Sequence, residues 1–302
     1  MSHASPLVDR IVDWYAENGR DLPWRRPDRS PWGVLVSEIM LQQTPVVRVL
    51  PRWREWMTSW PTPAHLAQAP TADVLRAWDR LGYPRRALRL QECARAIVER
   101  HGGEVPDDEA ALRALPGIGD YTAAAVRAFA FGRRAVVLDT NVRRVIARAA
   151  GGTALPPPHL GAAERARAAA LVPDDDAAAA RWAAASMELG ALVCTARSPH
   201  CEECPVVRRC VWNAAGLPPD EHAERRRTQA WHGTDRQVRG AVMALLRAHD
   251  GGLARAQVVT RLGAGAGATH GSLPDDAQLD RSLAGLVADG LAVLDGNRYR
   301  LP

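Results

Sequence analysis

The chain of 302 residues is long enough for one large domain or two smaller ones, and its 47% hydrophobic content is typical of a globular protein. No apolar run reaches the roughly 20 residues that a membrane span needs, and residues 1–10 lack the plan of a signal peptide, so we expect a cytoplasmic protein. The net charge of +5 is a mild indication of a polyanionic partner.

The cationic side chains, 39 in number, are all arginine, because the chain contains no lysine. Arginine richness is typical of a genome with high GC content, which is the simplest explanation. It also has a chemical consequence, since no side-chain amine is present to form a Schiff base. A mechanism with an enzymatic imine would have to use the N-terminus.

Helical patterns follow one another through most of the chain, and strand candidates are nearly absent from the first 230 residues. This part is therefore predicted to be all-α. The expected helices cover residues 9–18, 32–50, 52–60, 72–81, 85–100, 141–150, 162–170 and 177–192, with a further one beginning near Tyr121.

Two residues near the beginning of the chain are candidates for function. Trp24 lies in a proline-broken loop between arginines, where it could stack on a base or pin the loop to the body, and pinning is favoured. Glu38 lies in the 32–50 helix with apolar residues on both sides, and such an environment would raise its pKa by desolvation. A glutamate on the helix surface is the commoner alternative.

The stretch Leu115–Arg148 contains a glycine turn and a carboxylate. Its beginning, LPGIG, runs into an alanine-rich helix, and such a turn directs backbone N–H groups outward at the positive end of the helix dipole, where they suit a phosphate. Its end carries Asp139, between apolar residues and a pair of arginines. Asp139 can cap the 141–150 helix, and we expect it also to share one site with the phosphate turn.

Four of the five cysteines lie close together with the spacing C-x6-C-x2-C-x5-C: Cys194, Cys201, Cys204 and Cys210. In a cytosolic chain this cluster indicates a metal site rather than disulfides. Zinc usually takes two CxxC pairs, whereas here one pair is flanked by single cysteines, so an iron–sulfur cluster is favoured, with zinc as the alternative. Cys93 is expected to be a buried apolar residue.

The C-terminal part has a different pattern. A polar linker over residues 218–234 leads to helices over 236–248, 255–262 and 276–289, and then to strands over 291–294 and 297–301. This order predicts a small winged-helix-like α+β domain over 235–302, after a main domain over 1–217. Winged helices bind DNA, but they also serve as protein-contact or structural modules, and the sequence leaves these alternatives open.

The cysteine spacing after a helical domain with LPGIG resembles the endonuclease III superfamily of DNA glycosylases, from about Asp9 to Trp212. This resemblance implies a two-lobed, all-α fold with a helix-hairpin-helix, a [4Fe–4S] cluster on the four cysteines of residues 194–210, and duplex DNA in the cleft between the lobes. Four segments are similar to adenine DNA glycosylases of the MutY type: Arg20–Arg25, Ser37–Thr44, Leu81–Tyr83 and Glu188–Ala191.

The resemblance implies a base-excision-repair hydrolase that flips out an adenine mispaired with 8-oxoguanine or guanine and cleaves its N-glycosidic bond. Bifunctional relatives carry a lysine at the position of Tyr121, so this chain is implied to be monofunctional and to leave an abasic site. Glu38, reaching the site from the other lobe, would protonate the base, and ionised Asp139 would stabilise the oxocarbenium-like sugar by its charge or a transient covalent bond. Asn141 and Tyr121 would orient and polarise around Asp139.

DNA contacts are also implied by the resemblance. Gln43 would wedge into the vacated stack and Tyr83 would intercalate on the opposite strand. Together with Thr44, these residues would form the part of lesion recognition that the catalytic domain supplies. Trp24 and Arg25 would line the adenine pocket. The amides near Gly117 and Gly119 would hold a phosphate.

The sequence departs from the family at several places. Ala184 stands where a polar residue that helps to hold adenine is common, Thr140 stands where many members have glycine, and Pro84 follows Tyr83 where a second tyrosine is usual. The usual C-terminal domain related to Nudix hydrolases is replaced by the short tail, so the preference for 8-oxoguanine stays open. A thymine/uracil mismatch glycosylase is the alternative, and a non-catalytic iron–sulfur DNA-binding protein ranks below it. We expect a monomer associated with a bacterial nucleoid.

Overall fold

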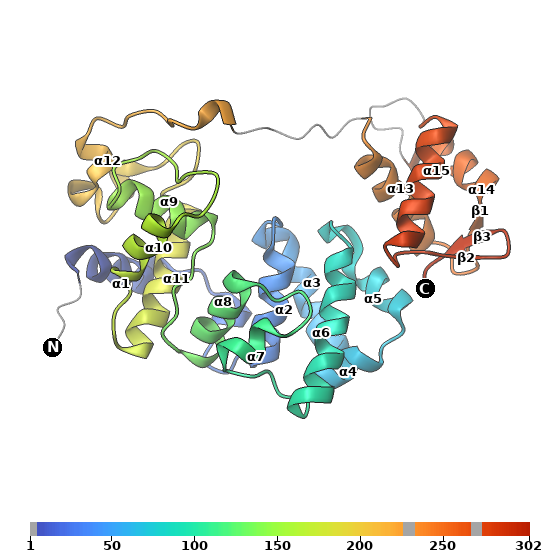
Figure 1. The fold of residues 1–302 in the computed structure, drawn as a ribbon, viewed down its shortest axis with the longest axis horizontal. Coiled ribbons are helices and arrows are strands. Elements are labelled where there is room, and N and C mark those ends of the chain that lie inside the picture. Colours follow the sequence, from blue (N-terminus) through green and yellow to red (C-terminus); the bar gives the residue numbers. More distant parts are fainter. Residues whose placement is uncertain (1–4, 226–232, 267–273) are drawn as a thin grey trace. The chain divides into compact units, whose positions relative to one another are not determined.

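The computed structural model describes residues 5–225, 233–266 and 274–302. Helices dominate these residues, and the strands among them all lie in the C-terminal part of the chain (Figure 1). Contacts between Cα atoms divide the chain into two compact units, each built from separate stretches of sequence. The first unit comprises residues 1–38, 105–114 and 118–227, and the second comprises residues 39–104, 115–117 and 228–302.

The first unit is a helical assembly around α1, α9 and α11. Its helices are α1 (Pro6–Asn18), α2 (Pro31–Leu41, which ends in the second unit), α7 (Glu109–Arg113), α8 (Asp120–Phe131), α9 (Thr140–Ala149), α10 (Ala162–Ala169), α11 (Asp176–Leu192) and α12 (Val211–Ala214). Short 3-10 helices cover Pro23–Arg25, Cys201–Glu203, Val207–Arg209 and Ala223–Arg225. Ile11, Val145 and Trp182 lie in one buried cluster that joins the three central helices. The burial of this shared apolar stripe stabilises the unit.

The helical part of the second unit is built around tryptophans. It contains α3 (Val46–Ser59), α4 (Pro63–Gln68), α5 (Thr71–Trp78), a 3-10 turn (Asp79–Leu81) and α6 (Arg85–His101). Trp56 and Trp78 are almost fully buried and pack edge to face, with ring centroids 5.7 Å apart. Aromatic pairs of this geometry add to the stabilisation that burial provides.

The C-terminal part has the order of a winged helix. Its elements are α13 (Asp235–Arg247), β1 (Leu253–Ala254), α14 (Arg255–Arg261), a π-helical turn (Leu262–Ala266), α15 (Asp276–Ala288), β2 (Val293–Asp295) and β3 (Arg298–Arg300). The antiparallel sheet has the order β1-β3-β2, with Tyr299 opposite both Leu253 and Leu294. The small α+β part that the sequence predicts is therefore present, with β1 as an unforeseen strand. Residues 226–232 of the predicted linker lie outside the described residues.

Two predicted helices have wrong bounds, since α3 begins inside the 32–50 segment and continues through Pro51 over most of the 52–60 segment. The pattern over residues 32–50 was expected to be continuous, but α2 ends at Leu41 and α3 begins at Val46. Between them Gln43 has a left-handed backbone, with φ of 55°, and Pro45 precedes the first turn of α3. Proline lacks an N–H group and disfavours the helical conformation of the residue before it, so the apolar periodicity continues across a break in the backbone.

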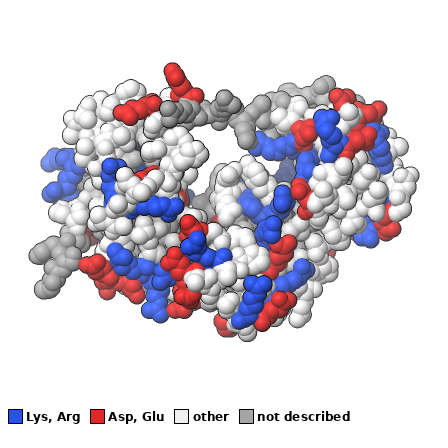
Figure 2. Space-filling view, viewed as in Figure 1, with Lys and Arg blue, Asp and Glu red and all other residues white. Residues whose placement is uncertain are grey.

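The surface carries both signs of charge. On the face drawn in Figure 2, arginine side chains lie among aspartates and glutamates rather than in one large patch. Charge alone therefore does not mark a nucleic-acid site on this face. No helix among the described residues is long and apolar enough to cross a membrane.

Candidate active site and iron–sulfur segment

Glu38 and Tyr121 form the centre of the candidate site in the first unit. Glu38, on α2, is 5% exposed, and the Tyr121 hydroxyl on α8 donates to its Oε2 at 2.8 Å. Burial raises the pKa of Glu38 to about 7, and the charge of Asp139 acts in the same direction, while the Tyr121 hydrogen bond and the charge of Arg25 oppose the rise. A carboxyl group with such a pKa can hold and deliver a proton near neutral pH.

Asp139 is the N-cap of α9. Its Oδ1 accepts the backbone N–H of Val142 at 2.7 Å, and its Oδ2 accepts the side-chain amide of Asn141 at 2.9 Å. Burial raises the pKa of Asp139, and these two hydrogen bonds oppose the rise. Asp139 can therefore both cap α9 and take part in the candidate active site. The cap fixes the direction of its carboxylate, and the charge of that carboxylate also acts on Glu38.

Asn141 is held from its other side by a buried arginine. Arg144, one turn later on α9, donates to Asn141 Oδ1 at 2.8 Å and to the carbonyl oxygens of Gly190 and Cys194, each at 2.6 Å. Gly190 allows this packing, since a Cβ atom there would lie 2.7 Å from Cβ of Asn141. A continuous set of hydrogen bonds therefore joins the Asp139 carboxylate to the backbone of the cysteine segment.

Glu38 lies in the same compact unit as Asp139 and Tyr121, and not in the other one as we expected from the sequence. The unit boundary falls after Glu38 within α2, so most of this helix packs with the first unit. Glu38, Tyr121 and Asp139 are consequently parts of one compact unit.

Glu188, in one of the segments similar to the MutY type, is another buried carboxylate. Glu188, on α11, is 0% exposed and accepts hydrogen bonds from Arg20 and Arg25, including a two-pronged pair with Arg20 at 2.7 Å. Burial acts to raise the pKa of Glu188, but the hydrogen bonds from the two arginines outweigh it and lower the pKa to about 2. Both arginines lie in the motif RDLPWR. Two cations so close together in the sequence were a signal that a carboxylate partner could be present.

Trp24 and Arg25 form a 3-10 turn together with Pro23. Trp24 is 4% exposed, which fits the favoured interpretation that it pins the loop. The Arg25 guanidinium lies 5.7 Å from the centroid of the Tyr15 ring, and its NH1 nitrogen is buried without a hydrogen-bond partner among the described residues. Arg25 therefore has a donor left over after its pairing with Glu188.

The candidate DNA-contact residues Gln43, Thr44 and Tyr83 belong to the second unit. Gln43 is exposed, and Tyr83 is 47% exposed. Thr44 is instead buried, and its hydroxyl donates to the carbonyl oxygen of Leu81 at 3.0 Å. The structure thus gives Thr44 a structural contact between two turns and leaves the other two side chains accessible.

The glycine turn lies between α7 and α8, which form the helix-hairpin-helix. Gly117 has φ of 79°, a left-handed conformation that favours glycine, and a Cβ there would lie 3.1 Å from Cβ of Arg89. Gly119 precedes the first residue of α8, and its position leaves open space around it. The arrangement matches the predicted turn that opens a helix.

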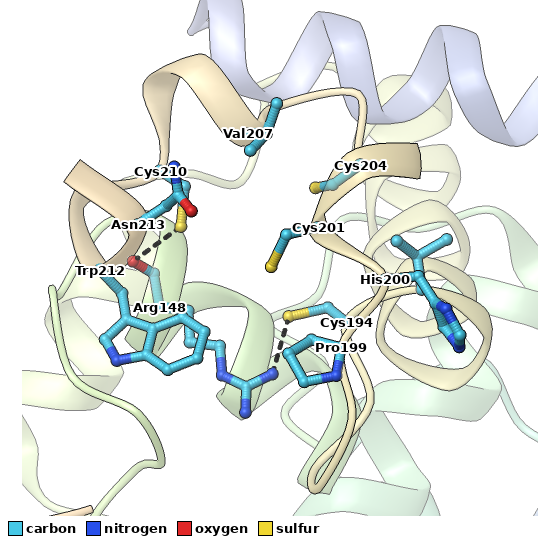
Figure 3. A pocket seen from close by; sticks show the side chains of 11 residues that line it. Arg148, Cys194, Pro199, His200, Cys201, Cys204, Val207, Cys210, Trp212 and Asn213 are labelled. Atoms are coloured by element: carbon cyan, nitrogen blue, oxygen red, sulfur yellow. Dashed lines mark hydrogen bonds between the residues drawn. The ribbon is translucent and has the colours of Figure 1, made fainter. Parts of the chain in front are cut away.

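The four clustered cysteines turn their sulfur atoms toward a common space, as Figure 3 shows. Cys194 follows the end of α11, Cys201 and Cys204 begin and follow the first of two short 3-10 helices, and Cys210 lies between the second one and α12, so one segment supplies the whole set. Arg148 borders the same space: its NH1 lies 3.4 Å from the Cys194 sulfur, and its guanidinium lies 4.4 Å from the centroid of the Trp212 ring. Cys93 is fully buried elsewhere, as expected.

The chemistry of this donor set fits an iron–sulfur cluster. Burial raises the pKa of Cys204 to about 11, and the neighbouring cysteines add to the rise. Four thiolates this close need positive charge between them, which iron supplies, and Arg148 adds a cation at the rim. Among the described residues, His200, Glu202 and Glu203 form another group of possible ligands, but all three are exposed.

Comparisons with known proteins show the family of the chain. A model of the HhH-GPD superfamily of base excision DNA repair proteins matches residues 36–167, and one of the iron–sulfur binding domain of endonuclease III matches residues 194–210. The chain is 49% identical to the adenine DNA glycosylase of Mycobacterium tuberculosis in an alignment of 300 residues that covers 97% of this chain and 92% of the relative. It is 37% identical to the thymine/uracil-DNA glycosylase of Pyrobaculum aerophilum over 208 residues, 68% of this chain and 90% of that one. The solved structure of a thermostable thymine-DNA glycosylase matches with a TM-score of 0.62 and 30% identity, over 69% of this chain and 95% of that chain.

These findings define the class: the chain is a helix-hairpin-helix DNA glycosylase with a [4Fe–4S] cluster on its four clustered cysteines, and DNA is its partner. The predicted fold class and the preference for iron–sulfur over zinc are confirmed. Within this superfamily the chain belongs to the family of adenine DNA glycosylases, since the match to that relative extends over nearly the whole chain, including the short C-terminal part.

Proposed function

We propose that the protein removes adenine from mismatched duplex DNA by hydrolysis of the N-glycosidic bond. The observation that carries the proposal is the buried Glu38 carboxyl, with a pKa of about 7, beside Tyr121 and within reach of the charge of Asp139. Adenine becomes a leaving group when a ring nitrogen is protonated, and Glu38 is the group that can supply this proton near neutral pH.

Asp139 stabilises the positive charge that develops on the sugar as the base departs. Its carboxylate is directed by the Val142 N–H and by Asn141, whose amide is itself held by Arg144. Tyr121 donates to Glu38 and thereby orients the acid. Because the chain has no lysine, no lysine imine forms with the sugar, and the product is an abasic site.

The DNA is held by residues other than those that cleave the N-glycosidic bond. The amides near Gly117 and Gly119 bind a backbone phosphate, Gln43 enters the space that the extruded nucleotide leaves, and Tyr83 intercalates on the opposite strand. Trp24 and Arg25 line the pocket of the base. Ala184 stands in place of a polar side chain and cannot bind adenine by a hydrogen bond. The unpaired NH1 donor of Arg25 therefore takes a larger part in holding the base.

The base opposite the adenine is 8-oxoguanine or guanine. We assign excision to residues 1–217 and treat residues 218–234 as a linker to a winged-helix-like domain over 235–302. The enzyme acts as a monomer on the DNA of the bacterial nucleoid. Removal of thymine or uracil is the second candidate, supported by the similarity to the Pyrobaculum aerophilum enzyme, whose name records that activity.

The test is a single-turnover excision panel with adenine opposite 8-oxoguanine, guanine and thymine, and with thymine opposite guanine. We expect release of adenine from the first two duplexes, and Glu38→Gln and Asp139→Asn each to abolish it while duplex binding persists. Retained excision in either variant would remove that residue from its role, and release of thymine alone would favour the second candidate. No turnover on any duplex would revive a non-catalytic DNA-binding protein.

A further inference from the structure

Two exposed residues of the second unit have an uncommon backbone. Gln43 and Tyr83 have φ values of 55° and 46°, in the left-handed region that side chains other than glycine rarely occupy. Such conformations persist only where the surrounding structure holds them. The turns at Gln43 and at Tyr83 therefore need a group that holds them.

Arg86, on the first turn of α6, contacts both of them. Its NH1 donates to the carbonyl oxygens of Ile39 and Gln42 at 2.7 Å and of Met40 at 3.1 Å. Its NH2 donates, each time at 3.1 Å, to the carbonyl oxygens of Leu81 and Gly82 and to Oγ1 of Thr44. One arm of the guanidinium therefore holds the turn before Gln43, and the other arm joins the residue after Gln43 to the two residues before Tyr83.

The flat faces of Arg86 are also covered. Its guanidinium carbon lies 5.2 Å from the centroid of the Trp78 ring and 5.6 Å from that of the Tyr83 ring. Trp78 is fully buried, so the guanidinium connects a ring in the core to an exposed one. The direction of the Tyr83 ring is thus tied to the core through Arg86.

The contacts require an arginine in particular. A planar fork can donate along two arms and stack at the same time, whereas a lysine offers a single nitrogen. The NH1 arm meets the last carbonyl groups of α2, where the helix dipole favours a cation. Burial lowers the pKa of Arg86 to about 10, so the guanidinium remains charged near neutral pH.

We propose that Arg86 is a positioning residue for base extrusion: it fixes Gln43 and Tyr83 in their wedge conformations before DNA binds. This inference rests on the wedge roles given to these two residues in the proposed function. A group that is already in place need not be ordered during binding, so more of the contact energy is available to keep the nucleotide out of the stack.

The test uses the full chain with its cluster and the variant Arg86→Lys, which keeps the charge but loses the fork. The matched control is Arg95→Lys, an exposed arginine further along α6. Hydrogen exchange of the free protein is measured at the amides of residues 42–44 and 81–83. Extrusion is measured as the fluorescence of 2-aminopurine placed next to the target adenine, with Glu38→Gln present in every protein so that no base is cleaved.

We expect faster exchange in both turns of Arg86→Lys and a drop of about tenfold in the equilibrium constant for extrusion at saturating protein, which corresponds to about 1.4 kcal/mol, the order of one net hydrogen bond. The control should behave as the parent. Normal exchange in Arg86→Lys, or faster exchange with an unchanged fluorescence rise, would overturn the proposal. If Arg86→Lys does not fold, Thr44→Val and Thr44→Ser decide instead: valine removes both the acceptor of one Arg86 contact and the Thr44–Leu81 hydrogen bond, whereas serine keeps the hydroxyl. Exchange at residues 42–44 must rise in Thr44→Val and stay normal in Thr44→Ser, and normal exchange in Thr44→Val would overturn the proposal.

Both readouts are independent of bond cleavage. An enzyme that released no adenine would contradict the proposed function, while exchange and 2-aminopurine fluorescence would still report on the turns and on extrusion. Conversely, normal excision by the parent protein together with unaltered extrusion in Arg86→Lys would contradict only the role of Arg86.

Discussion

Replacement of Tyr121 by phenylalanine tests how the proton affinity of Glu38 is set. The Tyr121 hydroxyl donates to Glu38 Oε2 at 2.8 Å and lowers the Glu38 pKa, against the larger effect of burial. Tyr121→Phe removes this donor and leaves the ring that covers the carboxyl. The pKa of Glu38 should therefore rise above its value of about 7.

The size of the shift follows from the hydrogen bond. A bond to a charged acceptor contributes about 1 kcal/mol more than the same bond to a neutral one, which corresponds to somewhat less than one pKa unit. Excision that depends on protonated Glu38 falls as the pH rises through its pKa. In Tyr121→Phe the basic limb of the pH–rate profile should therefore move to higher pH by about half a unit to one unit.

The assay is single-turnover adenine excision at saturating enzyme between pH 5.5 and 9, with Tyr299→Phe on β3 as a control for the loss of a tyrosine hydroxyl. Stability gives a second check. Glu38 is neutral in the fold up to a higher pH than in the unfolded chain, so its contribution is complete below the unfolded pKa and is lost as the pH rises through about 7. In Tyr121→Phe this loss should begin at the same pH, since the unfolded pKa is unchanged, and should continue to a higher pH, since the folded pKa is raised further. A basic limb that stays in place or moves to lower pH would refute the reasoning.

Three further substitutions follow from contacts in the first unit. Glu188→Gln should lower the free energy of unfolding in urea by about 3 kcal/mol, because Arg20 and Arg25 lose a buried counter-charge; the difference should hold at neutral pH and vanish as the pH falls through about 2, the lowered pKa of Glu188. Gly190→Ala should destabilise by about 1–3 kcal/mol in the same assay, since its methyl group would overlap Asn141, whereas the open position Gly161 should tolerate alanine. Cys204→Ser should abolish the visible absorbance of the cluster and lower the melting temperature, while Cys93→Ser should keep the absorbance; an unchanged spectrum in Cys204→Ser would exclude this thiolate as a ligand.

Local spacing in the sequence was sufficient for several parts of the site. The cysteine spacing indicated one compact metal site, and the structure brings the four sulfur atoms to one space. The LPGIG turn predicted a helix start, and α8 begins at Asp120. These features depend on residues close in the chain, so local geometry is enough to predict them.

The contacts that give the carboxylates their properties are not local. Tyr121 is 83 residues from Glu38, and Glu188 is 168 residues from Arg20. Apolar neighbours suggested that Glu38 is buried, but periodicity does not say which polar group meets a buried carboxyl. The break of the 32–50 helix was predictable in part, because Pro45 lies inside it, yet the apolar pattern is the same on both sides.

The distribution of these groups between the units allows chemistry and DNA handling to be separated by mutation. Glu38, Tyr121, Asp139 and Asn141 all belong to the first unit, whereas Gln43 and Tyr83 belong to the second, together with the Arg86 fork that holds them. A change at Tyr121 should move the titration of Glu38 without loosening the two turns, and a change at Arg86 should loosen the turns without moving that titration. If either variant produced both effects, the two sets of contacts would be coupled more tightly than their separate hydrogen bonds imply, and a double-mutant cycle between Tyr121→Phe and Arg86→Lys would measure that coupling.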